Sequence, residues 1–206
     1  IESLVDNLDP RLVEIDVVRF EGHGFSMVDN RLFALQLVQS GLTPATLFLA
    51  NGQVAQAADV LYKRPIVLMR GSFNPVCNLH LEVMAQVKKT FLSHINETQA
   101  DRCMEICEIS MNNLLRGDDV DHLEFLDRAD SLKALGKNVL ITKMARFDNL
   151  SGLLARYTRE PIAIALSICL RKEVVKEKWT EVIPGGIRES LGHTSQNKTR
   201  LYVSPW

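Results

Sequence analysis

One segment near the middle of the chain combines residue types that bind phosphate. It reads Arg70-Gly71-Ser72-Phe73-Asn74-Pro75-Val76-Cys77-Asn78-Leu79-His80-Leu81. An apolar run precedes it, and a helical pattern begins near its end. A helix N-terminus offers unpaired N–H groups and a positive dipole end to an anion. Gly71 permits close approach of the backbone, and His80 in the first helical turn could reach a phosphoryl oxygen, so the segment predicts a phosphate-binding loop.

The strands and helices that flank this segment must position it, and the sequence predicts them from alternating apolar runs and helical patterns. Six short apolar runs are candidates for strands: 12–20, 65–70, 103–110, 138–142, 161–167 and 201–204. Three segments between them have helical periodicity: 79–91, 121–135 and 150–159. Strand and helix alternate from about residue 65 to 168, which predicts a parallel sheet with right-handed crossovers. We therefore expect an α/β, Rossmann-like fold with about five parallel strands and helices on both faces.

The N-terminal part of the chain has a different pattern. An amphipathic segment over 29–40 ends at Gly41, and the segment 46–62 predicts a hairpin that turns at Asn51-Gly52. We expect residues 1–62 to form a small α+β extension packed on the sheet, and residues 63–206 to form a Rossmann-like nucleotide-binding domain. The chain begins with Ile1, which is expected of a processed product or a fragment.

Residues 71–81 resemble the first motif of the nicotinamide/nicotinate mononucleotide adenylyltransferases, which belong to the HxGH nucleotidyltransferase superfamily. Eukaryotic members read GSFNPxTNxHL, and eight positions match: Gly71, Ser72, Phe73, Asn74, Pro75, Asn78, His80 and Leu81. The resemblance implies adenylyl transfer from ATP to a mononucleotide phosphate, as in NAD biosynthesis, with ATP and Mg²⁺ as cofactors. It also implies that His80 is catalytic. The nucleotide-binding residues would be Gly71, Ser72, Phe73, Asn74, Cys77, Asn78 and Arg200.

Two departures from the family pattern support an alternative. Cys77 stands where the family has His or Thr, and a neutral thiol is the poorer phosphate donor. The family's second motif, SxTxxR, is matched only by 195–200, with Asn197 at the Thr position and Arg200 at the end. The nucleotide-binding site is therefore expected to be either active or vestigial. The alternative is a non-catalytic structural or interaction subunit of a larger assembly that uses a degenerate nucleotidyltransferase fold. Its partner would be another protein or a second copy of the chain.

Composition excludes several other classes. The 206 residues include 24 Lys and Arg against 25 Asp and Glu, a formal net charge of −1. Dedicated nucleic-acid binders usually have a basic excess, so we expect no nucleic-acid partner. No apolar run approaches the roughly 20 residues that span a bilayer, so we expect a soluble protein without a membrane span. The four cysteines lack CxxC spacing, which indicates the cytoplasm or another reducing compartment.

Several further residues have both a structural and a functional interpretation, and in each case we favour the structural one. Cys77 is expected to be a partly buried filler rather than a nucleophile, Cys103 and Cys107 to serve the core, and His23 to lie in a plain turn. The loop 184–190 could cradle a phosphate but is favoured as an ordinary loop. An acidic cluster is interpreted as a capped helix start, so no metal site is predicted. Its members are Asp118, Asp119, Asp121, His122, Glu124, Asp127 and Asp130.

Overall fold

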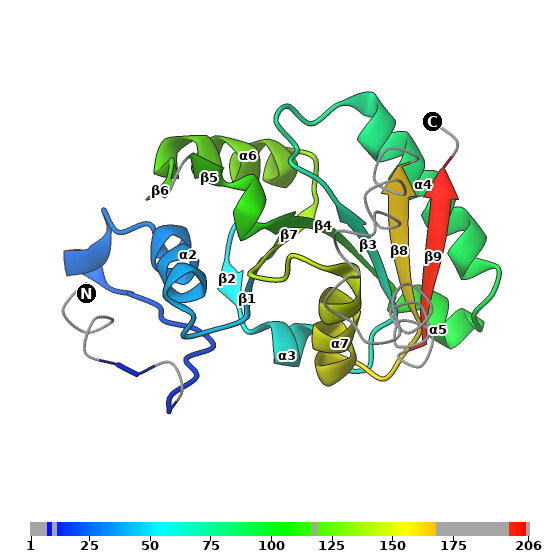
Figure 1. Cartoon of the computed structure of the whole chain (residues 1–206), viewed down its shortest axis with the longest axis horizontal. Coiled ribbons are helices and arrows are strands. Elements are labelled where there is room, and N and C mark those ends of the chain that lie inside the picture. The colour runs from blue at the N-terminus through cyan, green and yellow to red at the C-terminus, as the bar shows by residue number, and fades with distance from the viewer. Residues whose placement is uncertain (1–7, 10–11, 117–118, 168–197, 205–206) are drawn as a thin grey trace.

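A seven-stranded sheet forms the centre of the computed structural model, which describes residues 8–9, 12–116, 119–167 and 198–204. The strand order is β2-β1-β7-β4-β3-β8-β9. The bounds are β1 Ala45–Phe48, β2 Val54–Ala55, β3 Ile66–Arg70, β4 Met104–Ser110, β7 Asn138–Thr142, β8 Ile162–Ser167 and β9 Thr199–Ser204. A separate pair joins β5, Leu115–Arg116, to β6, Asp119–Val120. Figure 1 shows the main sheet crossing the molecule.

Five neighbouring strands, β7, β4, β3, β8 and β9, run parallel. Five of the six apolar runs form these strands, so the predicted parallel, Rossmann-like sheet is confirmed. Every residue of β3 is buried. That pattern is typical of a central parallel strand covered on both faces.

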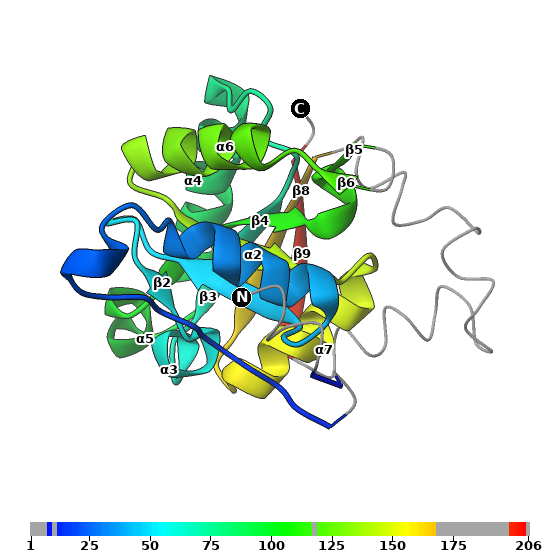
Figure 2. The same cartoon turned by 90° about the vertical axis from the view of Figure 1, so that its left-hand side faces the viewer.

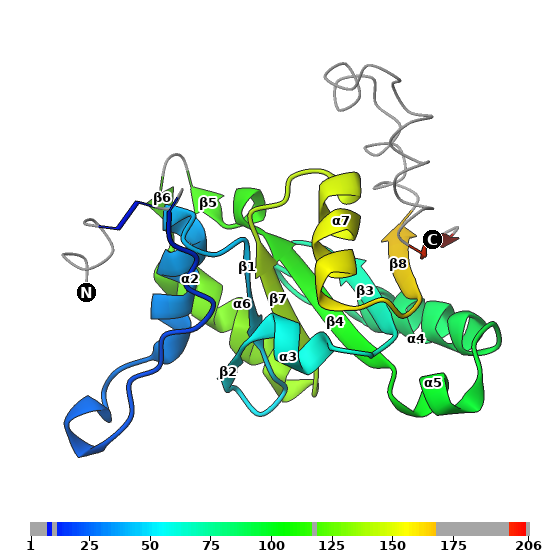
Figure 3. The same cartoon turned by 90° about the horizontal axis from the view of Figure 1, so that it is seen from below.

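Helices cover both faces of the sheet, as predicted. Their bounds are α2 Asn30–Ser40, α3 Ala57–Leu61, α4 Asn78–Leu92, α5 Glu97–Asp101, α6 His122–Ala134 and α7 Phe147–Tyr157, with single 3-10 turns η1 at His23–Phe25 and η2 at Met111–Asn113. Residues of α2, α4 and α6 share one hydrophobic cluster, whereas α3 and α7 contribute to a second. Figure 3 shows α3 and α7 together on the side nearer the viewer. The predicted helices 79–91, 121–135 and 150–159 correspond to α4, α6 and α7.

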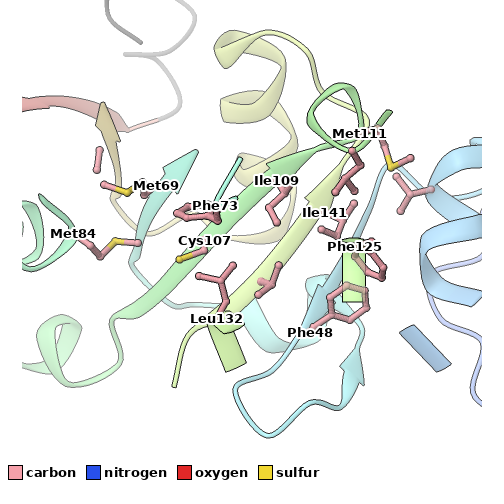
Figure 4. Packing of buried hydrophobic residues seen from close by; sticks show 14 of the residues in the cluster. Phe48, Met69, Phe73, Met84, Cys107, Ile109, Met111, Phe125, Leu132 and Ile141 are labelled. Atoms are coloured by element: carbon pink, nitrogen blue, oxygen red, sulfur yellow. The ribbon is translucent and has the colours of Figure 1, made fainter. Parts of the chain in front are cut away.

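The first cluster reaches the predicted phosphate-binding loop. Figure 4 shows Phe73 among Met69, Met84 and Cys107, which come from β3, α4 and β4. Phe73 is 1% exposed although it lies outside every helix and strand. The loop is therefore anchored in the core at this residue.

The N-terminal part follows the predictions only in part. The helix over 29–40 is confirmed as α2, which is followed by Gly41 with a φ of 81°. The hairpin expected over 46–62 is confirmed only in its first part, as β1 and β2, because residues 57–61 form the helix α3 instead. The hairpin is not packed on the sheet, however. Leu47 of β1 pairs antiparallel with Leu140 of β7, so β1 extends the sheet in its own plane. The division of the chain at residue 63 stays a prediction.

The strand expected over residues 12–20 is wrong. The segment runs along the molecule without joining a sheet, and hydrogen bonds to several other segments hold it. Ile15 donates its N–H to Leu42 at 2.9 Å, and Arg19 donates from Nη2 to the Val54 carbonyl at 2.8 Å. Figure 2 shows this segment in dark blue, with η1 projecting from the rest of the molecule.

Caps and cysteines agree with the structural interpretations favoured above, with one exception. The Asp121 carboxylate accepts hydrogen bonds from the N–H groups of Leu123 and Glu124, both at 3.0 Å, and so caps α6. Cys103 is half-buried and Cys107 buried, whereas Cys77 is exposed, so the expectation that Cys77 is partly buried is wrong. No helix in the described ranges is long and apolar enough to cross a membrane.

Candidate phosphate-binding loop

The loop 71–77 lies where the strand order of the sheet reverses direction. After β3 the chain returns to the sheet on one side, as β4, and β8 and β9 lie on the other side of β3. In open α/β sheets, ligands bind outside the carboxyl ends of the strands at such a switch point. The loop follows the carboxyl end of β3 and leads directly into α4. The fold thus puts the predicted loop at the edge of the sheet where open α/β folds usually bind ligands.

Gly71 and Phe73 fix the shape of the loop together. A Cβ added to Gly71 would lie 3.1 Å from Cζ of the Phe73 ring, so the ring packs directly against the glycine backbone. Phe73 itself has a φ of 48°, in the left-handed region that bulky residues rarely adopt. Burial of its ring holds it there. Gly71 is therefore required for the close approach of Phe73, and its own φ is ordinary.

Several backbone donors of this loop have no hydrogen-bond partner among the residues that the structure describes. The N–H groups of Ser72, Phe73 and Asn74 donate to no group in the described part of the chain, and neither do those of Asn78 and Leu79 at the start of α4. Free N–H groups in consecutive residues and at a helix N-terminus make a concavity suited to an anion. Ser72, Asn74 and Asn78 are exposed, which leaves the loop open to solvent.

His80 faces the loop from the first turn of α4. Its Nδ1 accepts a hydrogen bond from the Cys77 N–H at 3.1 Å, and the Cys77 Sγ lies 3.1 Å from the same nitrogen. Because Nδ1 accepts, the ring proton belongs on Nε2, which has no partner among the described residues. Burial lowers the pKa of His80. The ring is thus a neutral imidazole with one N–H available to a phosphate oxygen.

The cysteine at this position does more than fill space. Cys77 is the N-cap residue of α4, and the His80 N–H donates to its carbonyl at 3.0 Å. Together with the contact from the Cys77 N–H to Nδ1, this ties the two residues to each other reciprocally. Cys77 therefore orients the imidazole that the resemblance makes catalytic.

Helix α6 holds the loop from its other side, which the sequence did not predict. Asn74 donates from Nδ2 to the Glu124 carboxylate, and Arg128 donates to the same oxygen. Arg128 also donates from Nη1 to the carbonyls of Ser72, at 3.1 Å, and Asn113, at 2.8 Å. The sequence alone indicates only that Glu124 belongs to the capped helix start. The signal that could have drawn attention to it is the i, i+4 spacing of Glu124 and Arg128.

Arg200 does not lie with the other predicted site residues. It aligns with Ala163 of β8 and, through it, with Val67 near the amino end of β3. The loop begins beyond Arg70, three residues further along β3, or about 10 Å at the usual rise of a strand. Arg200 is exposed near the amino end of β9, so the structure does not place it as a phosphate ligand of this loop.

The remaining candidate residues stand as follows. The loop 184–190 and residues 195–197 of the weak second motif lie outside the described residues. His23 is exposed in η1, away from the loop. Among the residues that the structure describes, no group of three or more His, Cys, Asp or Glu side chains is placed to hold a metal ion.

The fold defines an α/β protein of Rossmann-like topology, with the loop 71–77 after the carboxyl end of β3. Comparison of the chain with models of protein families, with curated proteins and with solved structures found no match. The likeness to the adenylyltransferases therefore stays a resemblance carried by residues 71–81.

Proposed function

We propose that this protein binds a nucleotide through its phosphates at the loop 71–77 and the start of α4. One observation carries the proposal: the N–H groups of Ser72, Phe73 and Asn74 and the Nε2–H of His80 have no partner among the described residues and belong to the loop and helix start that follow the carboxyl end of β3. The resemblance of residues 71–81 to the adenylyltransferase motif supports it. A near-neutral chain can hold a nucleotide in this way, because backbone N–H groups bind phosphate without adding net charge.

The reaction that fits such a site is adenylyl transfer. A phosphate oxygen of the mononucleotide would attack the α-phosphorus of ATP, and pyrophosphate would leave. The loop would position the ATP phosphates, and His80 would donate a hydrogen bond to their developing charge. Mg²⁺ would enter with ATP and neutralise its phosphates.

Calorimetric titration tests the binding proposal. Wild-type protein is titrated with ATP, a nicotinamide mononucleotide and the dinucleotide, each up to about millimolar concentration. We expect ATP to bind, and His80→Ala to raise its Kd about tenfold, because one hydrogen bond to a charged group is lost. His94→Ala is the matched control, since His94 is exposed just beyond the other end of α4. No binding of any of the three ligands would overturn the proposal.

A second candidate is a non-catalytic structural or interaction subunit with the same fold. The position of Arg200 favours it, because the Arg of the weak C-terminal motif does not lie at the loop in the part of the chain described. Nucleotide binding without Mg²⁺-dependent formation of a dinucleotide would favour a vestigial site. A partner that copurifies with a chain unable to bind nucleotide would favour the subunit.

A further inference from the structure

We propose that Glu124 and Arg128 of α6 are positioning residues that hold the loop 71–77 in its phosphate-binding shape. This inference rests on the proposed function, because it concerns the same loop. It goes further in assigning a part of the site to a helix that the motif does not include. The two residues hydrogen-bond to the loop, but they are not among the backbone N–H donors that would contact the phosphate.

A single carboxylate oxygen joins the loop to the helix. Oε1 of Glu124 accepts hydrogen bonds both from Nδ2 of Asn74 and from Nη2 of Arg128. The side chain of Arg128 is 7% exposed and that of Glu124 19% exposed, so water competes little for these contacts. A hydrogen bond between charged partners is worth more in such surroundings than at the surface.

The contact between Arg128 and Ser72 sets the direction of a backbone donor. Nη1 of Arg128 donates to the Ser72 carbonyl at 3.1 Å. That carbonyl and the N–H of Phe73 belong to one planar trans peptide unit, in which the C=O and N–H bonds point in opposite directions. Because the carbonyl is held toward Arg128, the Phe73 N–H is directed away from it. This N–H is one of the donors that have no partner in the described ranges of the chain.

The loop needs such support because its backbone conformation is unfavourable by itself. Phe73 has a φ of 48°, and residues in sparsely populated regions keep their conformation only when their surroundings hold them. Helix α6 is a rigid support, since Phe125 and Leu132 are buried in the first hydrophobic cluster. Arg128 also binds the Asn113 carbonyl at 2.8 Å, which ties the segment after β4 to the same guanidinium.

Four variants in the full chain test the inference. Glu124→Ala removes the shared acceptor, whereas Glu124→Gln keeps an amide oxygen that can still accept from Asn74. Arg128→Lys keeps the charge but cannot donate in two directions from a planar fork. Asp130→Asn is the matched control on the same helix, because Asp130 forms its ion pair with Arg31 and is not bonded to the loop.

Two readouts are measured for each variant that is folded by circular dichroism. The first is the Kd of Mg·ATP by calorimetry. The second is the rate at which iodoacetamide labels Cys77, which is exposed in the loop and reports its shape without any nucleotide. We expect Glu124→Ala and Arg128→Lys to raise the Kd about tenfold and to change the labelling rate severalfold. Glu124→Gln and Asp130→Asn should stay within about threefold of wild type in both.

The two readouts separate failure of this inference from failure of the proposed function. If wild type does not bind ATP, the proposed function fails. The labelling rates of Cys77 then still test whether Glu124 and Arg128 hold the loop in its shape. If wild type binds ATP but Glu124→Ala binds it equally well, the positioning role is overturned and the proposed function stands. If Glu124→Ala does not fold, Arg128→Lys decides, and an unchanged labelling rate in Arg128→Lys overturns the inference.

Discussion

Arg70 and Glu108 form a buried ion pair at the carboxyl ends of β3 and β4, joined by two hydrogen bonds, Nε to Oε2 at 2.6 Å and Nη2 to Oε1 at 3.0 Å. Arg70 also donates to the carbonyls of Met144 and Ala145, at 2.7 and 2.8 Å, and its guanidinium lies 4.7 Å from the centre of the Phe147 ring. The pair therefore fixes the segment between β7 and α7 at the edge of the sheet that bears the loop 71–77.

Breaking this pair should strongly destabilise the fold. Arg70→Ala leaves the Glu108 carboxylate, which is fully buried, without its cationic partner. We expect the free energy of unfolding to fall by about 3–5 kcal/mol, measured by urea denaturation. Glu21→Gln is the control, because Glu21 pairs with Arg19 at the exposed surface and should cost less than about 1 kcal/mol. Equal effects of the two substitutions would contradict the assigned role of burial.

Two glycines should respond to alanine in opposite directions. In Gly71→Ala the new Cβ meets the Phe73 ring, and we expect a loss of about 1–3 kcal/mol in unfolding free energy, together with weaker ATP binding. Gly152 lies inside α7, with no atom within 4 Å of an added Cβ, so Gly152→Ala should stabilise by about 0.5–1 kcal/mol. Thermal and urea unfolding measure both effects. If Gly71→Ala leaves the free energy of unfolding unchanged, the loop and the Phe73 ring can move apart at little cost, and the assigned role of Gly71 is wrong.

The described cysteines should differ in their reactivity. Burial raises the pKa of Cys103 to about 11 and that of Cys107 to about 12, so their reactive thiolate forms are scarce at pH 8. Cys77 is exposed. Iodoacetamide at pH 8 should label Cys77 first, as measured by mass spectrometry of peptides, and the other two mainly after unfolding. If the proposed function holds, ATP should slow the labelling of Cys77.

His80 should make stability depend on pH in one direction. Its pKa is lowered by burial, so the unfolded chain binds a proton more readily than the folded protein near the ordinary pKa of about 6.5. The free energy of unfolding should therefore be highest above pH 6.5 and should fall as the pH drops through the lowered pKa of the folded protein. His80→Gln should flatten this part of the profile in urea titrations between about pH 7 and 5. An identical slope in the variant would show that other groups cause the dependence.

Arg200 distinguishes the role implied by the sequence motif from the position given by the strand pairing of β9. Because it lies at the amino end of β9, we expect Arg200→Ala to leave the Kd of ATP unchanged within about twofold. The sequence motif alone predicts a loss, since its Arg would grip phosphate. Calorimetry decides between them, with His80→Ala as the positive control. A tenfold loss would restore Arg200 to the site.

The sequence predicted most of the individual strands and helices, but it did not predict the side-chain contacts between segments that lie far apart along the chain. Apolar runs such as 65–70 gave the parallel strands, because a strand covered on both faces must be apolar throughout. The run 12–20 failed, since its apolar residues alternate with acids and find no strand to pair with. Glu124 contacts Asn74, and Arg70 contacts Glu108, across long separations in sequence that no spacing rule reveals. A short match to a motif also says nothing about the strand end at which Arg200 lies.

The pairing of β1 with β7 has a consequence for how the chain folds. Leu47 finds its partner Leu140 only after β3, β4 and the helices between them have been made. During synthesis the edge of β1 that pairs with β7 therefore stays unpaired until β7 has been made. Contacts between residues so far apart in the sequence slow folding. Docking of this hairpin should be among the late events on the folding pathway, and until then the unpaired edge is a point at which two chains could associate.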